Sequence, residues 1–305
     1  MGAPKVAVEP RSGRHDSLVD AVRAGGGEVV DAADAEALVW ADAARPDLLP
    51  GVLAAAPDLR WVQLPYAGIE SFTHLLDHDR TWTCGKGVYA PPVAEHALAL
   101  ALAGMRHVAG YARADRWEAP VGRNLLGARV TVLGGGEITV SLAELLAPFA
   151  VELTVVRRRP DPFPGAARTL SPDRLDDALP GADLVVLALA LTPETTGLID
   201  AGRLALMEPH AWLVNVARGR HIVTDDLVAA LRAGTIGGAA LDVTDPEPLP
   251  PGHPLWSLPN AVITPHIANT PEMGVPLLAA RVTENVRRFA AGETLLGLVD
   301  VDAGY

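Results

Sequence analysis

The chain has 305 residues, 49% of them hydrophobic and 20% charged, which is enough apolar surface for about two compact domains and excludes global disorder. Lysine and arginine number 25 against 37 aspartates and glutamates, so the net charge of -12 disfavours nucleic acid, a polyanion, as a partner. The single cysteine, Cys84, excludes an intrachain disulfide and a thiolate metal cluster. We expect no metal site.

The sequence predicts neither a membrane-spanning segment nor a secretory signal. The longest apolar runs, residues 97–105 and 184–191, fall short of the roughly 18 residues that suggest a membrane span. The first residues lack the apolar run of a secretory signal. Zincin, serine-hydrolase and P-loop motifs are also missing. The sequence therefore predicts a cytoplasmic protein that does not cross a membrane.

The first 84 residues alternate short apolar runs with one helical pattern. Strands are predicted at residues 5–8, 37–40 and 60–64, and a helix at 16–24. A loop rich in glycine and proline follows, and then a predicted helix over residues 93–112 that is almost free of charge. A helix this apolar should be buried on most sides, and we expect it to pack against a second domain or a second subunit.

The middle of the chain repeats strand, turn and helix. Strands are predicted at 129–133, 152–156, 183–190, 212–216, 238–243 and 261–264, and helices at 138–149 and 224–233. The continuous Val/Leu runs are typical of parallel strands that are covered on both faces. A last helix, residues 271–291, is expected to pack back on the first unit. We therefore predict an α/β fold of two Rossmann-like or flavodoxin-like domains. A doubly wound domain, residues 93–270, is inserted into a domain made of residues 1–92 and 271–305.

A glycine-rich turn joins the strand at 129–133 to the next helix. Gly134-Gly135-Gly136 in this position is a dinucleotide-binding fingerprint. Gly134 would make the tight turn, and Gly136 would let backbone N–H groups approach the pyrophosphate. The third glycine of the motif is replaced by Thr139, whose Cβ is expected to loosen the packing of helix on strand and shift the phosphate pocket. The simpler alternative is a plain glycine turn before a helix.

Three consecutive arginines follow the next predicted strand. An acidic residue for the ribose hydroxyls is usual about 20 positions after the glycine turn, but here the chain reads Arg157-Arg158-Arg159. Guanidinium groups cannot accept hydrogen bonds from a 2′-hydroxyl, yet they pair well with a 2′-phosphate. The sequence predicts that NADP(H) is preferred over NAD(H). A solvated basic loop is the alternative.

Three further segments follow predicted strands of the same domain: Asn215-Val-Ala-Arg218-Gly219, Leu241-Asp242-Val-Thr-Asp-Pro-Glu247-Pro-Leu and Thr264-Pro-His266-Ile-Ala. With the glycine turn and the helix start Val93-Ala94-Glu95-His96, they resemble the D-isomer-specific 2-hydroxyacid dehydrogenases, most strongly over residues 125–268. The resemblance implies an oxidoreductase that transfers a hydride between NADP(H) and a small 2-oxo or D-2-hydroxy acid of the glyoxylate/hydroxypyruvate type. Residues 93–270 would bind the dinucleotide, and the other domain would bind the substrate.

The resemblance also implies a catalytic role for three residues. Arg218 would hold the substrate carboxylate and polarise its carbonyl, and His266 would donate the proton. Glu247 would orient the imidazole. Asp245 is the rival carboxylate, but the family pattern places the acid directly before Pro-Leu. Each residue also has a purely structural alternative: a turn cap for Arg218, a surface acid for Glu247 and a core histidine for His266.

Other site residues are implied in the same way. The predicted cofactor contacts are Gly134, Gly136, Glu137, Ile138, Arg157, Arg158, Thr192, Ala217 and Asp242. The predicted substrate contacts are Tyr66, Ala67, Gly68, Tyr89 and Arg218. The loop at residues 64–69 would bind the substrate through its backbone N–H groups. Tyr89 stands where the family commonly has Asn. The remaining predicted structural or surface histidines are His96, His107, His210, His221 and His253.

Two other readings of the function stay open. The family contains co-repressors that keep the fold without catalysis, so a dinucleotide-binding scaffold is the main alternative. Relatives that oxidise formate or phosphite rank lower, because their reactions suit NAD better than an arginine-rich pocket. The predicted partners are a small-molecule 2-oxo acid and a second copy of the chain in a homodimer. Two domains also imply hinge closure near residues 90–95 and 268–272.

Overall fold

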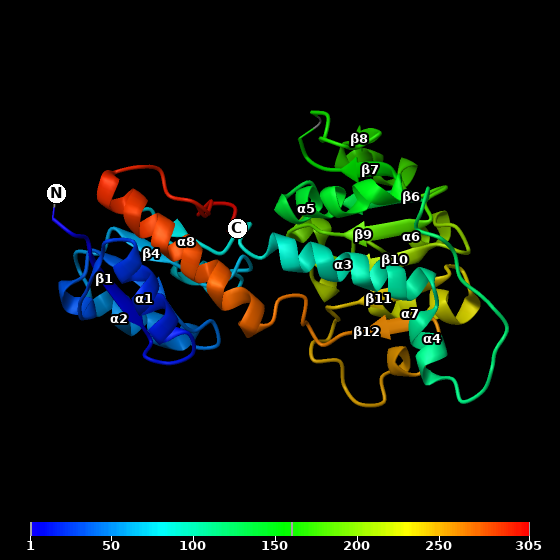
Figure 1. Ribbon diagram of the computed structural model, residues 1–305, viewed down its shortest axis with the longest axis horizontal. Helices are drawn as coiled ribbons and strands as arrows, with labels where there is room; N and C mark the ends of the chain where they lie inside the picture. Colours follow the sequence, from blue (N-terminus) through cyan, green and yellow to red (C-terminus); the bar gives the residue numbers. More distant parts are fainter. Residues whose placement is uncertain (1, 160, 305) are drawn as a thin grey trace. The chain divides into compact units, whose positions relative to one another are not determined.

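The computed structural model describes residues 2–159 and 161–304, which form two compact units, each built on its own parallel sheet (Figure 1). Unit 1 comprises the described residues up to Tyr89 together with those from Thr270 onward, and unit 2 comprises Ala90–Asn269. The predicted α/β class is confirmed. The chain therefore leaves unit 1 once, completes unit 2 and returns.

Unit 1 has a five-stranded sheet in the order β2-β1-β3-β4-β5, which is the flavodoxin-like order. Its strands are β1 (Lys5–Glu9), β2 (Glu28–Val29), β3 (Ala37–Trp40), β4 (Trp61–Gln63) and β5 (Thr81–Thr83). Its helices are α1 (His15–Ala24), α2 (Leu49–Ala55) and α8 (Pro271–Ala291). The prediction missed β2 and β5, because strands of two or three residues show no readable alternation. It also missed the helix α2.

The C-terminal helix α8 packs on unit 1 beside α1, as Figure 1 shows. Gly25 follows α1 directly, and a Cβ at that position would lie 2.6 Å from the carbonyl oxygen of Thr283. The Thr283 hydroxyl in turn donates to the carbonyl of Ala21 at 3.0 Å. Close contact with α8 is therefore possible because the residue after α1 has no side chain.

Unit 2 has a seven-stranded, fully parallel sheet in the order β12-β11-β10-β9-β6-β7-β8. This is the doubly wound Rossmann order with one added strand. Its strands are β6 (Arg129–Leu133), β7 (Glu152–Val156), β8 (Arg168–Leu170), β9 (Leu184–Leu187), β10 (Trp212–Asn215), β11 (Gly238–Leu241) and β12 (Ala261–Ile263). Its helices are α3 (Ala90–Met105), α4 (Val108–Arg113), α5 (Glu137–Leu146), α6 (Ala201–Leu206) and α7 (Thr224–Ala233).

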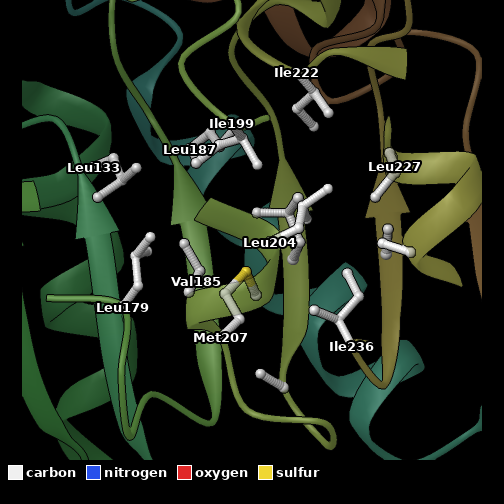
Figure 2. Packing of buried hydrophobic residues seen from close by; sticks show 14 of the residues in the cluster. Leu133, Leu179, Val185, Leu187, Ile199, Leu204, Met207, Ile222, Leu227 and Ile236 are labelled. Atoms are coloured by element: carbon white, nitrogen blue, oxygen red, sulfur yellow. The ribbon is translucent and has the colours of Figure 1, made fainter. Parts of the chain in front are cut away.

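Both faces of this sheet are covered by helices and loops. On one face, Leu204 from α6 and Leu227 from α7 pack with strand residues such as Val185 (Figure 2). On the other face, side chains of α3 and α5 pack against the same strands. Each fully buried Leu or Val contributes about 1.5–3 kcal/mol of transfer free energy. Burial on both sides explains why the strands are continuously apolar.

The single helix predicted over residues 93–112 is wrong in two respects. The structure has α3 and α4 in its place, separated at His107, which has a φ of +55°. A right-handed helix cannot continue through a left-handed residue. The apolar surface of α3 is also not reserved for a second domain or subunit, because it packs on α5 and the sheet of its own unit. A Cβ at Gly104 would lie 2.3 Å from the Trp212 ring.

In the described part of the chain, no helix is both long and apolar enough to span a bilayer.

Candidate active site

The glycine turn lies at the carboxyl end of β6, where the strand order of unit 2 reverses. Gly134 has a φ of +115°, and its N–H donates to the carbonyl of Val156 at 2.8 Å. A Cβ at Gly134 would lie 2.1 Å from the carbonyl oxygen of Ala188. Both the backbone conformation and the space therefore require glycine here.

Gly136 precedes α5, and a Cβ there would meet no atom within 4 Å. The N–H groups of the first turn of a helix have no intrahelical acceptor and form the positive end of the helix dipole. Glu137 and Ile138, two of the predicted cofactor contacts, are the first residues of α5. The turn therefore offers open backbone donors at a helix N-terminus, which suits a pyrophosphate.

The expectation that Thr139 loosens the packing of this helix is wrong. Thr139 is completely buried, and its hydroxyl donates to the carbonyl of Gly134 at 3.0 Å. A threonine can bond a preceding backbone carbonyl in this way. The side chain in the third glycine position thus ties α5 to the glycine turn.

The arginines after β7 differ in their surroundings. Arg157 donates to the carbonyl of Asp161 at 2.7 Å, and its guanidinium carbon lies 5.4 Å from the centre of the Phe163 ring. Its aliphatic part crosses the glycine turn, since a Cβ at Gly135 would lie 2.5 Å from the Arg157 Cδ. Arg158, by contrast, is exposed. The structure therefore anchors Arg157 beside the glycine turn and leaves the Arg158 side chain accessible to solvent.

Two loops after β9 and β10 carry further predicted cofactor contacts. Thr192 N–H donates to the Thr195 hydroxyl at 2.8 Å, which closes a tight turn. His221 is fully buried, and its two ring nitrogens lie 2.9 Å and 3.2 Å from the carbonyl oxygens of Thr195 and Leu189. Burial lowers the pKa of His221. A neutral imidazole has only one N–H, so His221 donates to one carbonyl at a time while linking the two ends of this loop.

Arg218 lies on the turn after β10, and the buried side chain of Asn215 shapes that turn. The Asn215 amide donates to the carbonyl of Arg218 at 2.9 Å and accepts from the N–H of Ala217 at 3.0 Å. Next in the chain is Gly219, where a Cβ would lie 1.9 Å from the carbonyl oxygen of Thr244. The missing side chain lets the Arg218 turn touch the loop that follows β11. The sequence predicted no role for Asn215 or Gly219.

Glu247 and His266 form a direct pair. His266 Nδ1 lies 2.7 Å from Glu247 Oε1, while the other carboxylate oxygen lies 3.4 Å from the N–H of Thr244. About half of the His266 side chain is exposed, so its Nε2 edge remains available to a ligand. No such contact joins Asp245 to His266 among the described residues. Glu247, and not the rival Asp245, is therefore the partner of the imidazole.

His266 itself adopts an unusual backbone conformation, with a φ of +53°. A left-handed residue other than glycine costs about 1–3 kcal/mol and is often found at functional sites. Its N–H donates to the carbonyl of Asp242 at 2.9 Å. The neighbouring loop thus holds the imidazole in a conformation that an isolated segment would rarely adopt.

Asp242 is a buried anion directly after β11. Burial by itself would raise its pKa, but hydrogen bonds from His96, from Thr264 and from the N–H groups of Ile267 and Ala268 lower the pKa to about 2. The N–H groups of Ile267 and Ala268 lie 2.9 Å and 3.0 Å from its oxygens. The predicted cofactor contact at Asp242 therefore has a carboxylate already occupied by four protein donors.

The predicted substrate loop belongs to unit 1. The backbone N–H groups of Ala67 and Gly68 make no hydrogen bond within the described residues, so they are open to a ligand. Tyr66 is partly exposed, and the Arg14 side chain donates to its hydroxyl and lies 4.5 Å above its ring. Free backbone donors beside a guanidinium group suit a carboxylate.

Tyr89, another of the predicted substrate contacts, lies inside unit 1. Its ring is buried, and its hydroxyl donates to the carbonyl of Pro65 at 2.5 Å. Burial raises the pKa of Tyr89 well above its usual value. The Tyr89 hydroxyl therefore supports the loop that contains Tyr66, because it is hydrogen-bonded to Pro65 inside unit 1.

The described residues of unit 2 bring the three predicted catalytic residues to one edge of the sheet. Arg218, Glu247 and His266 follow β10, β11 and β12, which are neighbours in the sheet and parallel. The carboxyl ends of parallel strands lie at the same edge, which is where doubly wound sheets bind ligands. Among the described residues, no group of three or more His, Cys, Asp or Glu side chains could hold a metal ion.

The chain is similar to proteins that bind nicotinamide dinucleotides. Residues 97–268 match the model of the D-isomer specific 2-hydroxyacid dehydrogenase NAD binding domain. A Xanthobacter autotrophicus D-isomer specific 2-hydroxyacid dehydrogenase, solved in complex with NADPH and MES, superimposes with a TM-score of 0.85 at 30% identity, covering 100% of both chains.

Two curated relatives match as well. An uncharacterized Corynebacterium melassecola protein, from the region 3′ of proB, is 40% identical over 301 residues, covering 95% of this chain and 97% of that protein. The Yersinia enterocolitica glyoxylate/hydroxypyruvate reductase A is 35% identical over 178 residues, but the match covers only 58% of this chain and 56% of the reductase.

The resemblance inferred from the motifs is thus confirmed by the fold and by these matches. The glycine turn has the open backbone that a dinucleotide-binding turn requires, and the paired imidazole and carboxylate lie at the same edge of the sheet. The chain belongs to the D-isomer specific 2-hydroxyacid dehydrogenases, a family of NAD(P)-dependent oxidoreductases.

Proposed function

We propose that this protein reduces a small 2-oxo acid of the glyoxylate/hydroxypyruvate type with NADPH. The observation that carries the proposal is the 2.7 Å pair of His266 and Glu247. These residues follow β12 and β11, on the same edge of the sheet as the glycine turn after β6. The name of the Yersinia enterocolitica relative supports the substrate class, and the NADPH complex of the Xanthobacter autotrophicus structure supports the cofactor.

The proposed mechanism assigns one task to each side chain. When bound, the reduced nicotinamide supplies the hydride for the carbonyl carbon. Arg218 pairs with the substrate carboxylate and polarises the carbonyl. Glu247 holds Nδ1 of His266, so Nε2 is the nitrogen that delivers a proton to the oxygen of the developing alkoxide. Glycine in the turn and the first residues of α5 hold the pyrophosphate.

The two units are proposed to have different tasks. Unit 2 contains the glycine turn and the three proposed catalytic residues, so it binds the dinucleotide. Unit 1 contributes substrate contacts through the free N–H groups of Ala67 and Gly68 and through Tyr66. Thr192, Ala217 and Asp242 are proposed to shape the cofactor loops. The cytoplasmic location and the hinge near residues 90–95 and 268–272 stay predictions.

A substrate panel tests the proposed function. The purified protein is assayed with glyoxylate, hydroxypyruvate and bulkier 2-oxo acids, each with NADPH and with NADH, by the loss of nicotinamide absorbance. We expect oxidation of NADPH with the small 2-oxo acids. Tight binding of NADPH without turnover of any member would contradict the proposal and favour the dinucleotide-binding scaffold.

Cofactor choice is tested by Arg157→Asp. The carboxylate would repel a 2′-phosphate and could accept a hydrogen bond from a 2′-hydroxyl, so the ratio of kcat/KM for NADPH over NADH should fall by about 30-fold or more. Both kcat/KM values are measured with one saturating 2-oxo acid. Arg232→Asp makes the same change of charge at an exposed position of α7 and should leave the ratio unchanged. An unaltered preference in Arg157→Asp would sink this assignment.

We also propose that two copies of the chain form a homodimer. The segment from α4 to β6 exposes large apolar side chains that the described chain leaves uncovered: Val108, Trp117, Val121 and Leu126. Trp117 is fully exposed, and such a patch is unusual on a monomer. Light scattering should give the mass of two chains, and Trp117→Ser with Val121→Ser should shift the mass toward one. A monomeric wild-type protein would rule out the dimer.

A further inference from the structure

One buried polar cluster of unit 2 has no part in the mechanism proposed above. His96, in the second turn of α3, places its Nε2 3.0 Å from the Thr264 hydroxyl and 3.3 Å from Asp242 Oδ1. Only 18% of the His96 side chain is exposed, and Asp242 is almost completely buried. His96 was predicted to be a structural or surface histidine, and its partner Thr264 is 168 residues away along the chain.

The hydrogen atoms of this cluster can be assigned. The Thr264 hydroxyl is 2.5 Å from Asp242 Oδ1, which is an anion, so the hydroxyl donates and the carboxylate accepts. The Thr264 oxygen is then left to accept from His96. Both acceptors of His96 Nε2 therefore require an N–H at that nitrogen, and the imidazole donates to Thr264 and Asp242 together.

The same carboxylate controls the backbone around His266. Asp242 Oδ1 accepts from the N–H of Ile267 at 2.9 Å, and Oδ2 accepts from the N–H of Ala268 at 3.0 Å. Thr264 precedes His266 by two residues, and the N–H of His266 donates to the carbonyl of Asp242. The cluster thus binds the chain on both sides of His266. By itself, this residue would rarely adopt its φ of +53°.

We propose that His96 is a positioning residue for His266. It fixes the orientation of Thr264 and Asp242, and these two residues hold the loop that keeps the His266 imidazole on Glu247. His96 touches neither substrate nor cofactor in this proposal, and its effect passes through the loop alone. The proposal rests on the proposed function only for its catalytic readout, since the loop geometry can be measured without any substrate.

The test compares two substitutions at His96 with one control. His96→Met fills a similar volume without an N–H, whereas His96→Gln places an amide N–H near the position of Nε2. The control is His210→Met. It removes another histidine that is paired with a largely buried aspartate, since His210 Nε2 lies 2.7 Å from Asp183 Oδ1. His210 precedes β10 and so lies at the opposite edge of the sheet from His266.

Kinetic results are expected for three variants with NADPH and glyoxylate. His96→Met should lower kcat by about tenfold with KM and the Kd of NADPH changed by less than about twofold, because the proton donor is misplaced while binding is kept. His96→Gln should recover to within about threefold of the wild-type kcat. His210→Met should keep the wild-type kcat, and thermal unfolding of all variants verifies that they are folded.

A second readout does not need turnover. In protein labelled with 13C-histidine, the His266 resonance is assigned by its loss in His266→Gln. It should shift in His96→Met, return in His96→Gln and stay in place in His210→Met. An unchanged His266 resonance in folded His96→Met would overturn the inference. If the resonance responds as expected but wild-type protein reduces no 2-oxo acid, the positioning role stands and the proposed function fails.

Discussion

His266→Gln is expected to lower kcat for the reduction of glyoxylate by about 10²–10⁴-fold, because a positioned general acid contributes an acceleration of that size. Glutamine keeps a hydrogen-bonding side chain that can face Glu247, but its amide cannot deliver a proton to an alkoxide at neutral pH. The Kd of NADPH should stay within about threefold of the wild-type value, since the cofactor is held by the glycine turn. Steady-state kinetics and NADPH fluorescence titration measure the two quantities.

The matched control is His253→Gln. His253 is in the same unit and accepts a hydrogen bond from the N–H of Leu255 at 3.3 Å. Within the described residues it makes no hydrogen bond or ion pair with Arg218, Glu247 or His266. Its substitution should leave kcat near the wild-type value. If folded His266→Gln retains most of the wild-type kcat, the imidazole is not the proton donor.

Arg218→Gln should reduce kcat/KM for the 2-oxo acid by about 10²–10³-fold. A guanidinium both pairs with the substrate carboxylate and stabilises the charge that develops on the carbonyl oxygen, and loss of one such donor costs about this much. Arg218→Lys should recover only part of the activity, because an ammonium group cannot form a forked pair with a carboxylate.

The division of this loss between kcat and KM identifies what Arg218 does. A rise in KM with an unchanged kcat would mean that Arg218 binds the ground state and the transition state equally, and the polarising role would be abandoned. Arg220→Gln is the control, since Arg220 is exposed and only two residues away on the same turn. This control should keep both parameters close to their wild-type values.

The sequence predicted those parts of the fold that depend on local patterns. Long apolar strands such as β6 and β7 and the strand–glycine–helix order around Gly134 were correctly located. The short strands β5 and β8 were missed, since three residues show no distinctive period. The interruption at His107 was also missed, because nothing in the residues near it signals a left-handed backbone.

The candidate site was likewise predicted only in part from the sequence. The motif Glu247-Pro-Leu was sufficient to choose Glu247 over Asp245 as the partner of His266, and the structure has that contact. The cofactor contact of Asp242 stays a prediction, and the sequence did not show that its oxygens accept from four protein donors. Thr139 was expected to disturb the glycine turn, but its hydroxyl bonds to the turn. These contacts depend on which donors lie near Asp242 and which acceptor lies near Thr139 in space.

The sequence by itself determined the α/β class and the position of the glycine turn, because strand periodicity and a strand–glycine–helix order are local properties of the chain. Its motifs also carried the family resemblance that singled out Arg218, Glu247 and His266. Only the tertiary structure decided how those residues are supported. Asn215 shapes the Arg218 turn, and His96, Asp242 and Thr264 join α3 to the segments after β11 and β12. Such contacts depend on parallel strands that end at a common edge, and no spacing along the chain records which side chains meet there.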